Sequence, residues 1–281
     1  MLLVALSLAA PVPAVGSTGM RLATPGQTVV GRPKLTYLEL LRMIVTDLQM
    51  TNGADARAKG HEVASFRNIL GPDGGGDAPD SIEIDSFATL EFKTGGRSRL
   101  ALLVDLGESE GRIEHTALLA LFDLTAAPRL LDLVDIGMDQ SVYFADTPLV
   151  RLGRNDEALV LVGTHSNSNQ SYAKHALVFA DGDKWRLIDS FATLSDRYCA
   201  FDRDETPHFS TRPGRSPIFS DVVVTVRERQ KATGADCGVE KGAQDYARAY
   251  TAIYRWNSAK GRFVGDRSAL TRLEAVNNKR Y

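Results

Sequence analysis

The feature that most constrains the fold of this chain is a strand pattern that returns along the sequence. Residues Ala101–Asp132 align without a gap on Ala158–Asp189. The identical positions include Leu102 with Leu159, Phe122 with Phe179, Leu130 with Leu187, and Asp132 with Asp189. The hexapeptide Asp-Ser-Phe-Ala-Thr-Leu also occurs twice, at Asp85–Leu90 and at Asp189–Leu194. Repetition at this period predicts similar β units that must stack to bury their faces.

Each unit is expected to hold three short strands joined by turns. The predicted strands are Leu100–Leu106, Thr116–Asp123 and Arg129–Ile136, then Ala158–Thr164, His175–Ala180 and Trp185–Phe191, then Asp221–Val226, Tyr250–Trp256 and Arg262–Val264. The turn Asp181-Gly182 between two apolar runs is a strong hairpin signal, because glycine accepts the positive φ that such turns need. Residues 141–152 would supply a fourth strand.

The predicted fold is therefore mainly β, with repeated antiparallel units of three to four strands and one N-terminal helix. A small propeller-like arrangement of these units is one expectation, since short, regularly spaced strands suit it. A β-sandwich or two stacked sheets is the alternative, because the same spacing suits that architecture too.

The N-terminal region divides into three predicted parts before the β domain of residues 81–281. Residues 1–16 resemble a signal peptide, with a short apolar core and small residues at Ala14 and Gly16, although no Lys or Arg precedes the core. Residues 17–80 are interpreted as a tether, a helix and a loop. Thr36 and Glu39 form a capping-box pattern, and apolar spacing extends the predicted helix over residues 37–49.

The composition of the chain limits where the protein is expected to be located and which classes of partner it is expected to bind. The net charge is -2, so the chain has no basic field for a nucleic acid backbone. No apolar run after the N-terminus is long enough to span a membrane in the mature chain. Cys199 and Cys237 are the chain's two cysteines. In an exported protein such a pair most simply forms a disulfide, whereas in the cytosol two free thiols are expected.

The most unusual local sequence is His165–Tyr172, between the first two strands of the second unit. Its side chains offer donors, acceptors and an aromatic face suited to a neutral polar ligand such as a sugar or a peptide end. The candidate ligand-binding residues are His165, Asn167, Asn169, Gln170 and Tyr172. The competing interpretation is a solvated turn whose side chains bond to their own backbone.

The corresponding segments of the other units differ in charge. The first unit has Glu108, Glu110 and Glu114, and the third has Arg227, Arg229 and Lys231. In a propeller the equivalent loops gather on one face, so Arg227 and Arg229 join the candidate ligand-binding residues on the condition that the fold is propeller-like.

Other residues are assigned structural roles. Asp132 and Asp189 each end an Arg-Leu-[Leu/Ile]-Asp strand, which suggests a strand-end ligand for backbone amides rather than a catalytic acid. Strand alternation places Trp185 on the same face as Leu187 and Phe191, which favours a core position over a sugar-stacking platform.

No catalytic, metal-binding or cofactor-binding motif is recognised in the sequence. His165 and His175 flank one turn without a third ligand, so neither a metal nor a cofactor is expected. The preferred hypothesis is an exported, periplasmic or secreted, monomeric binding module for a small polar ligand, glycan or peptide. The alternative is a hydrolase of an envelope polymer or peptide that uses His165 or Tyr172 with a carboxylate from a neighbouring loop.

Overall fold

A computed structural model describes residues 20–51, 57–71, 78–108, 115–234 and 243–280. The predicted signal segment, residues 1–16, lies outside these ranges. The described chain is mainly β, as predicted, and its strands form two large sheets and two small ones. No helix among the described residues is long and apolar enough to cross a membrane.

The first large sheet has six strands in the order β1-β8-β9-β10-β11-β6. Its strands are β1 (Arg21–Ala23), β8 (Phe87–Thr94), β9 (Arg97–Glu108), β10 (His115–Asp123), β11 (Arg129–Asp135) and β6 (Arg67–Asn68). All neighbours are antiparallel except β11 and β6. The edge strand β1 comes from the segment that was predicted to be a tether.

The second large sheet has eight antiparallel strands in sequence order from β12 to β19. Its strands are β12 (Val142–Arg151), β13 (Glu157–Ser166), β14 (Gln170–Asp181), β15 (Lys184–Arg197), β16 (Phe201–Arg212), β17 (Asp221–Ala232), β18 (Tyr246–Asn257) and β19 (Arg262–Asp266). Strands β15 and β16 pair only over Ser195–Arg197 and Asp202–Asp204, and they then diverge. Strands β16–β19 therefore fold back across β12–β15.

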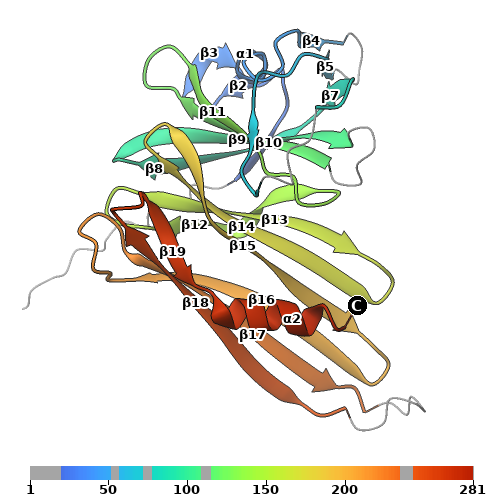
Figure 1. Ribbon diagram of the computed structural model, residues 1–281. Helices are drawn as coiled ribbons and strands as arrows, with labels where there is room; N and C mark the ends of the chain where they lie inside the picture. Colours follow the sequence, from blue (N-terminus) through green and yellow to red (C-terminus); the bar gives the residue numbers. More distant parts are fainter. Residues whose placement is uncertain (1–19, 52–56, 72–77, 109–114, 235–242, 281) are drawn as a thin grey trace, which may run out of the picture.

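The result is a stack of three β layers, with the N-terminal elements above the first layer (Figure 1). One apolar cluster lies between the N-terminal elements and the six-stranded sheet, and it includes Leu102 and Phe122. A second lies between the six-stranded sheet and β12–β15, and it includes Leu159 and Trp185. A third fills the space between β12–β15 and β16–β19. The helix α2 (Ser268–Asn277) contributes Leu270 and Leu273 to this third cluster.

The stacked-sheet alternative fits this arrangement, and the propeller-like arrangement does not describe it. The predicted units do not separate into small blades, because their strands continue into one another within the six- and eight-stranded sheets. Of the elements that were not predicted, β16 is largely polar, and α2 follows the last strand with only a short apolar stripe.

The N-terminal helix begins as predicted but is shorter. Thr36 and Glu39 form the capping box at the start of α1 (Tyr37–Leu41). The chain then turns, because its next residues bond to a distant segment: the Ile44 carbonyl accepts from Ala64, and Asp47 accepts the amides of His61 and Glu62. The small elements β2 (Thr28–Val29), β3 (Arg32–Thr36), β4 (Gln49–Met50), β5 (Ala58–Gly60) and β7 (Ile82–Ile84) complete this region.

The two aligned stretches share a meander of three strands and a β-bulge. In β11, Leu131 is the extra residue between Leu130 and Asp132, and in β15 Ile188 takes the same place. The bulge thus falls at the third position of both Arg-Leu-[Leu/Ile]-Asp sequences.

The gapless alignment fails in the middle strand of the meanders. Asp132 pairs with Leu121, whereas Asp189 pairs with Leu177 instead of the aligned Val178. A slip of one residue moves a side chain to the other face of its sheet. Phe122 consequently packs towards the N-terminal elements, and Phe179 packs towards the third layer.

Trp185 lies in the core, as the sequence favoured. It is fully buried in the second cluster and stacks on Phe92 with ring centroids 5.4 Å apart. Leu187 shares its cluster, but Phe191 lies in the third cluster. The prediction for Phe191 was wrong because the bulge at Ile188 reverses the alternation.

Candidate functional site

Two of the predicted site residues, His165 and Tyr172, lie directly opposite each other on β13 and β14. Their positions in the strands place them on the face of β13 and β14 that packs against the six-stranded sheet, beyond the end of the apolar cluster between these two layers. The imidazole Nδ1 of His165 lies 3.2 Å from Asp139 Oδ1. The loop that carries Asp139 is held by a hydrogen bond from the His115 amide to the Asp139 carbonyl. Gly137 permits this approach, because a Cβ there would collide with the His115 carbonyl oxygen.

The turn between these strands supports the solvated-turn interpretation for its asparagines. Asn167 Oδ1 accepts the amides of Asn169 at 3.2 Å and Gln170 at 2.9 Å. The Asn169 carbonyl accepts from the Arg197 amide. Because Asn167 is engaged with its own turn, its carbonyl oxygen is committed to the backbone rather than presented to a ligand.

Gln170 points into the protein rather than out of the turn. Its Nε2 donates to Asp196 Oδ1 at 3.1 Å and to the Tyr198 hydroxyl at 3.3 Å. Asp196 is fully buried and also pairs with Arg203. Gln170 therefore joins the turn to a polar network inside the protein.

Arg227 and Arg229 are not brought to His165. Both are exposed on β17, on the face opposite to the buried Glu228. Because β17 belongs to the third layer and this face points away from β13, the predicted convergence of charged loops does not occur. Of the acidic residues in the first unit, Glu110 and Glu114 lie outside the described residues. Cys237, the second cysteine of the predicted disulfide, also lies outside them.

A groove beside Tyr172 is the most suitable ligand site on this side of the molecule. It has a volume of about 370 Å³ and lies between β14, β15 and α2. Its lining includes Tyr172, Lys174, Phe191, Arg267, Glu274 and Asn277. Lys174 forms no ion pair with any residue that the structure describes. The groove therefore combines an aromatic side chain with an ammonium group available to a ligand.

The helix side of the groove is held by Arg267. Its Nη2 donates to Glu274 Oε1 at 2.7 Å and to the Ser190 carbonyl at 3.3 Å, and its Nη1 lies 3.4 Å from Asp189 Oδ1. Burial raises the pKa of Asp189, which also accepts from the Tyr254 hydroxyl. These contacts fix α2 against β15.

Beneath the groove lies a buried pair of carboxylates. Glu205 and Glu228 are directly opposite each other on β16 and β17, and both side chains are fully buried. Arg280 bridges them, with Nη1 3.2 Å from Glu205 Oε1 and Nη2 2.6 Å from Glu228 Oε1. Asn277 donates to Glu205 Oε2 at 2.8 Å and so connects the groove to the pair.

The two carboxylates respond differently to burial. Burial raises the pKa of Glu205. Burial also acts to raise the pKa of Glu228, but hydrogen bonds from Arg280 and Tyr246 outweigh it, and the pKa is lowered. Both carboxylate side chains are fully buried and bonded to Arg280, so the pair fastens the C-terminal segment.

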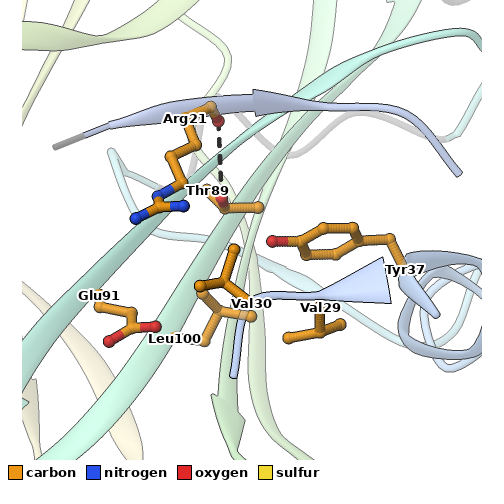
Figure 2. Close-up of a pocket in the computed structure, with 7 residues that line it drawn as sticks. All are labelled: Arg21, Val29, Val30, Tyr37, Thr89, Glu91 and Leu100. Carbon is orange, nitrogen blue, oxygen red and sulfur yellow. Dashed lines mark hydrogen bonds between the residues drawn. The ribbon is translucent and has the colours of Figure 1, made fainter. Parts of the chain in front are cut away.

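Another cavity lies under the N-terminal hairpin. Figure 2 shows it between β2 and the six-stranded sheet, with Arg21 and Glu91 towards one end and the Tyr37 ring towards the other. Its volume is about 160 Å³, less than half that of the groove.

Metal binding is not indicated by the described residues, since no group of three or more His, Cys, Asp or Glu side chains there is placed to hold an ion. Single sequence motifs do not predict the groove, because one of its sides is formed by α2 and the residues that flank it. The apolar spacing of Leu270 and Leu273 was the only signal of that helix.

No protein-family model, no curated protein and no solved structure matches the chain. The function therefore has to be argued from the groove and its surroundings.

Proposed function

We propose that the protein is an exported, monomeric, non-enzymatic binding module that holds the end of a peptide or a glycan in the groove between β14, β15 and α2. The observation that carries this proposal is the available ammonium group of Lys174 in a groove that also presents the aromatic ring of Tyr172. An ammonium group attracts a carboxylate, and an aromatic ring stacks on a sugar or an apolar side chain.

The rigidity of the site supports binding rather than a moving catalytic lid. Tyr172 and Lys174 are on a strand, and Asn277 is tied to Glu205. A groove whose walls are already ordered loses little conformational entropy when it is filled, which favours affinity.

The test is an array of glycans and of peptides with free C-termini, probed with the mature chain. We expect saturable binding to a subset of the array, and a loss of at least about tenfold in Lys174→Met because a charge-assisted contact is removed. Lys231→Met changes an exposed lysine of β17 and serves as the matched control. Equal binding by the Lys174→Met protein and the wild type would refute the assignment of the groove.

The pair formed by His165 and Asp139 favours hydrolysis as a second candidate function. A carboxylate 3.2 Å from an imidazole can orient it as a general base. His165, however, is exposed and lines none of the cavities described above. The binding proposal predicts no turnover of chromogenic ester, peptide and glycoside substrates. Turnover that disappears in His165→Gln while the protein remains folded would establish the hydrolase instead.

A further inference from the structure

A buried arginine at the other end of the molecule has two nitrogen atoms without hydrogen-bond partners. Arg99, on β9, is 4% exposed and stands opposite Phe92 of β8. Its Nε has no hydrogen-bond partner. Its Nη1 lies 3.1 Å from Asp123 Oδ1 without hydrogen-bond geometry, and its Nη2 lies 3.5 Å from Asp183 Oδ1. A buried donor left unpaired is costly, so such a group calls for an acceptor.

The cavity beside Arg99 has room for a ligand that supplies such an acceptor. It has a volume of about 350 Å³ and lies where the turn between β8 and β9 meets the turn between β14 and β15. A smaller cavity of about 190 Å³ is also lined by Arg99. The buried Nε1 of Trp185, which stacks on the neighbouring Phe92, is another donor without a partner.

Both positively and negatively charged side chains line the larger cavity. Arg97 and Arg99 contribute positive charge to the lining, and Asp156, Asp181 and Asp183 contribute negative charge. The Gly95 amide donates to Asp156 Oδ1 at 2.7 Å, which fixes that carboxylate at the rim. A ligand that carries only an anion would meet three carboxylates, and a ligand that carries only a cation would leave the Nε and Nη1 atoms of Arg99 without a hydrogen-bond acceptor.

The remaining wall of the cavity is apolar. It is formed by Phe219 and by Ile218, which is 58% exposed although large and apolar. Phe219 packs edge-on against Trp256, with ring centroids 4.8 Å apart. An apolar group of a ligand would cover the exposed part of Ile218.

We propose that this cavity binds a small zwitterion with an apolar side chain, that is, an α-amino acid or a short peptide. The carboxylate is placed on Arg99 and Arg97, the ammonium group on Asp181 and Asp183, and the side chain on Ile218 and Phe219. The cavity shares no lining residue with the groove beside Tyr172, so this inference is independent of the proposed function.

Intrinsic fluorescence provides the test, because Trp256 packs against Phe219 of the cavity wall. We expect L-leucine or L-leucyl-L-leucine to give a saturable change in the emission of the full chain. N-acetyl-L-leucine lacks the ammonium group and L-leucine amide lacks the carboxylate, so each should bind at least about tenfold more weakly. The absence of a saturable change with either zwitterion, or equal binding of the blocked compounds, would overturn the proposal.

Amino-acid substitutions test whether the fluorescence change comes from binding in this cavity. Arg99→Gln should abolish the fluorescence change. Arg97→Gln changes an exposed position and should weaken binding of the zwitterion. It therefore tests the site even if the Arg99→Gln protein does not fold. Arg129→Gln is the control, because Arg129 also pairs with Asp123 but lines neither cavity. Lys231→Met, at an exposed position of β17 that lines neither this cavity nor the groove, should leave the titration unchanged. Undiminished binding by Arg97→Gln and Arg99→Gln would contradict the proposed site.

Discussion

At the scale of single residues, Trp185 is the strongest determinant of the packing between the first two layers. It is fully buried and stacked on Phe92, and its backbone amide donates to Asp132 of the facing sheet at 2.7 Å. We expect Trp185→Ala to lower the free energy of unfolding by about 3–5 kcal/mol, because a large cavity is left behind. Urea unfolding measures this loss. Trp185→Phe should cost much less, since it keeps the stacking and removes the unpaired Nε1; equal losses would show that stacking is unimportant.

His175 makes stability depend on pH. It is buried against Phe191, and burial lowers its pKa to about 4. In the unfolded chain its pKa is about 6.5, so between these values the unfolded state binds the extra proton. Its contribution is therefore complete above pH 6.5 and is lost as the pH falls towards 4, by roughly 3 kcal/mol in all.

Unfolding experiments at pH 7 and pH 5 test this dependence. Wild type should lose more stability than His175→Gln between the two pH values. His61→Gln, which changes an exposed histidine, should behave like wild type. If the His175→Gln protein shows the wild-type pH dependence, His175 is not the group responsible.

At the scale of elements, sequence periodicity predicted the strands well and their faces less well. The nine strands expected in the three units all correspond to observed strands, because alternating apolar residues and Asp-Gly turns are local signals. The predicted faces of the β15 side chains beyond Leu187 were wrong because of the bulge at Ile188. This bulge depends on pairing with β14, which the local sequence does not show. The helix after Leu41 failed because Ile44 and Asp47 bond to residues 61–64, a contact that no local pattern reveals.

The candidate site was predicted in part for the same reason. His165 and Tyr172 were identified because they are adjacent in an unusual segment. Lys174, Arg267 and Asn277 were missed because the groove needs α2, which is almost a hundred residues further along the chain. The assignment of Arg227 and Arg229 depended on a propeller and failed with it.

The attachment of α2 depends on Arg280. This residue neutralises Glu205 and Glu228, and removing one partner of a buried ionic cluster leaves uncompensated charge. We expect Arg280→Met to lower stability by about 3 kcal/mol in chemical unfolding at neutral pH. The double variant Arg280→Met with Glu228→Gln should recover part of this loss. A double variant less stable than Arg280→Met would argue against charge compensation as the role of Arg280.

At the scale of the whole molecule, export and the disulfide are linked predictions. Mass spectrometry of the protein from its native host should find a new N-terminus between Val15 and Ser17. Cys199 and Cys237 should resist alkylation until reductant is added, because an oxidising compartment favours their disulfide. An intact Met1 in a cytoplasmic fraction would exclude export, and labelling of both thiols without reductant would exclude the bond.

The central claim is that the groove between β14, β15 and α2 holds a ligand, and native mass spectrometry tests it most directly. Protein purified gently from the exported fraction of its host should carry a non-covalent adduct of discrete mass. The adduct should persist in Lys231→Met and disappear in Lys174→Met, because Lys174 provides the groove's available ammonium group. A wild-type protein without an adduct, or a Lys174→Met protein that retains it, would contradict this account.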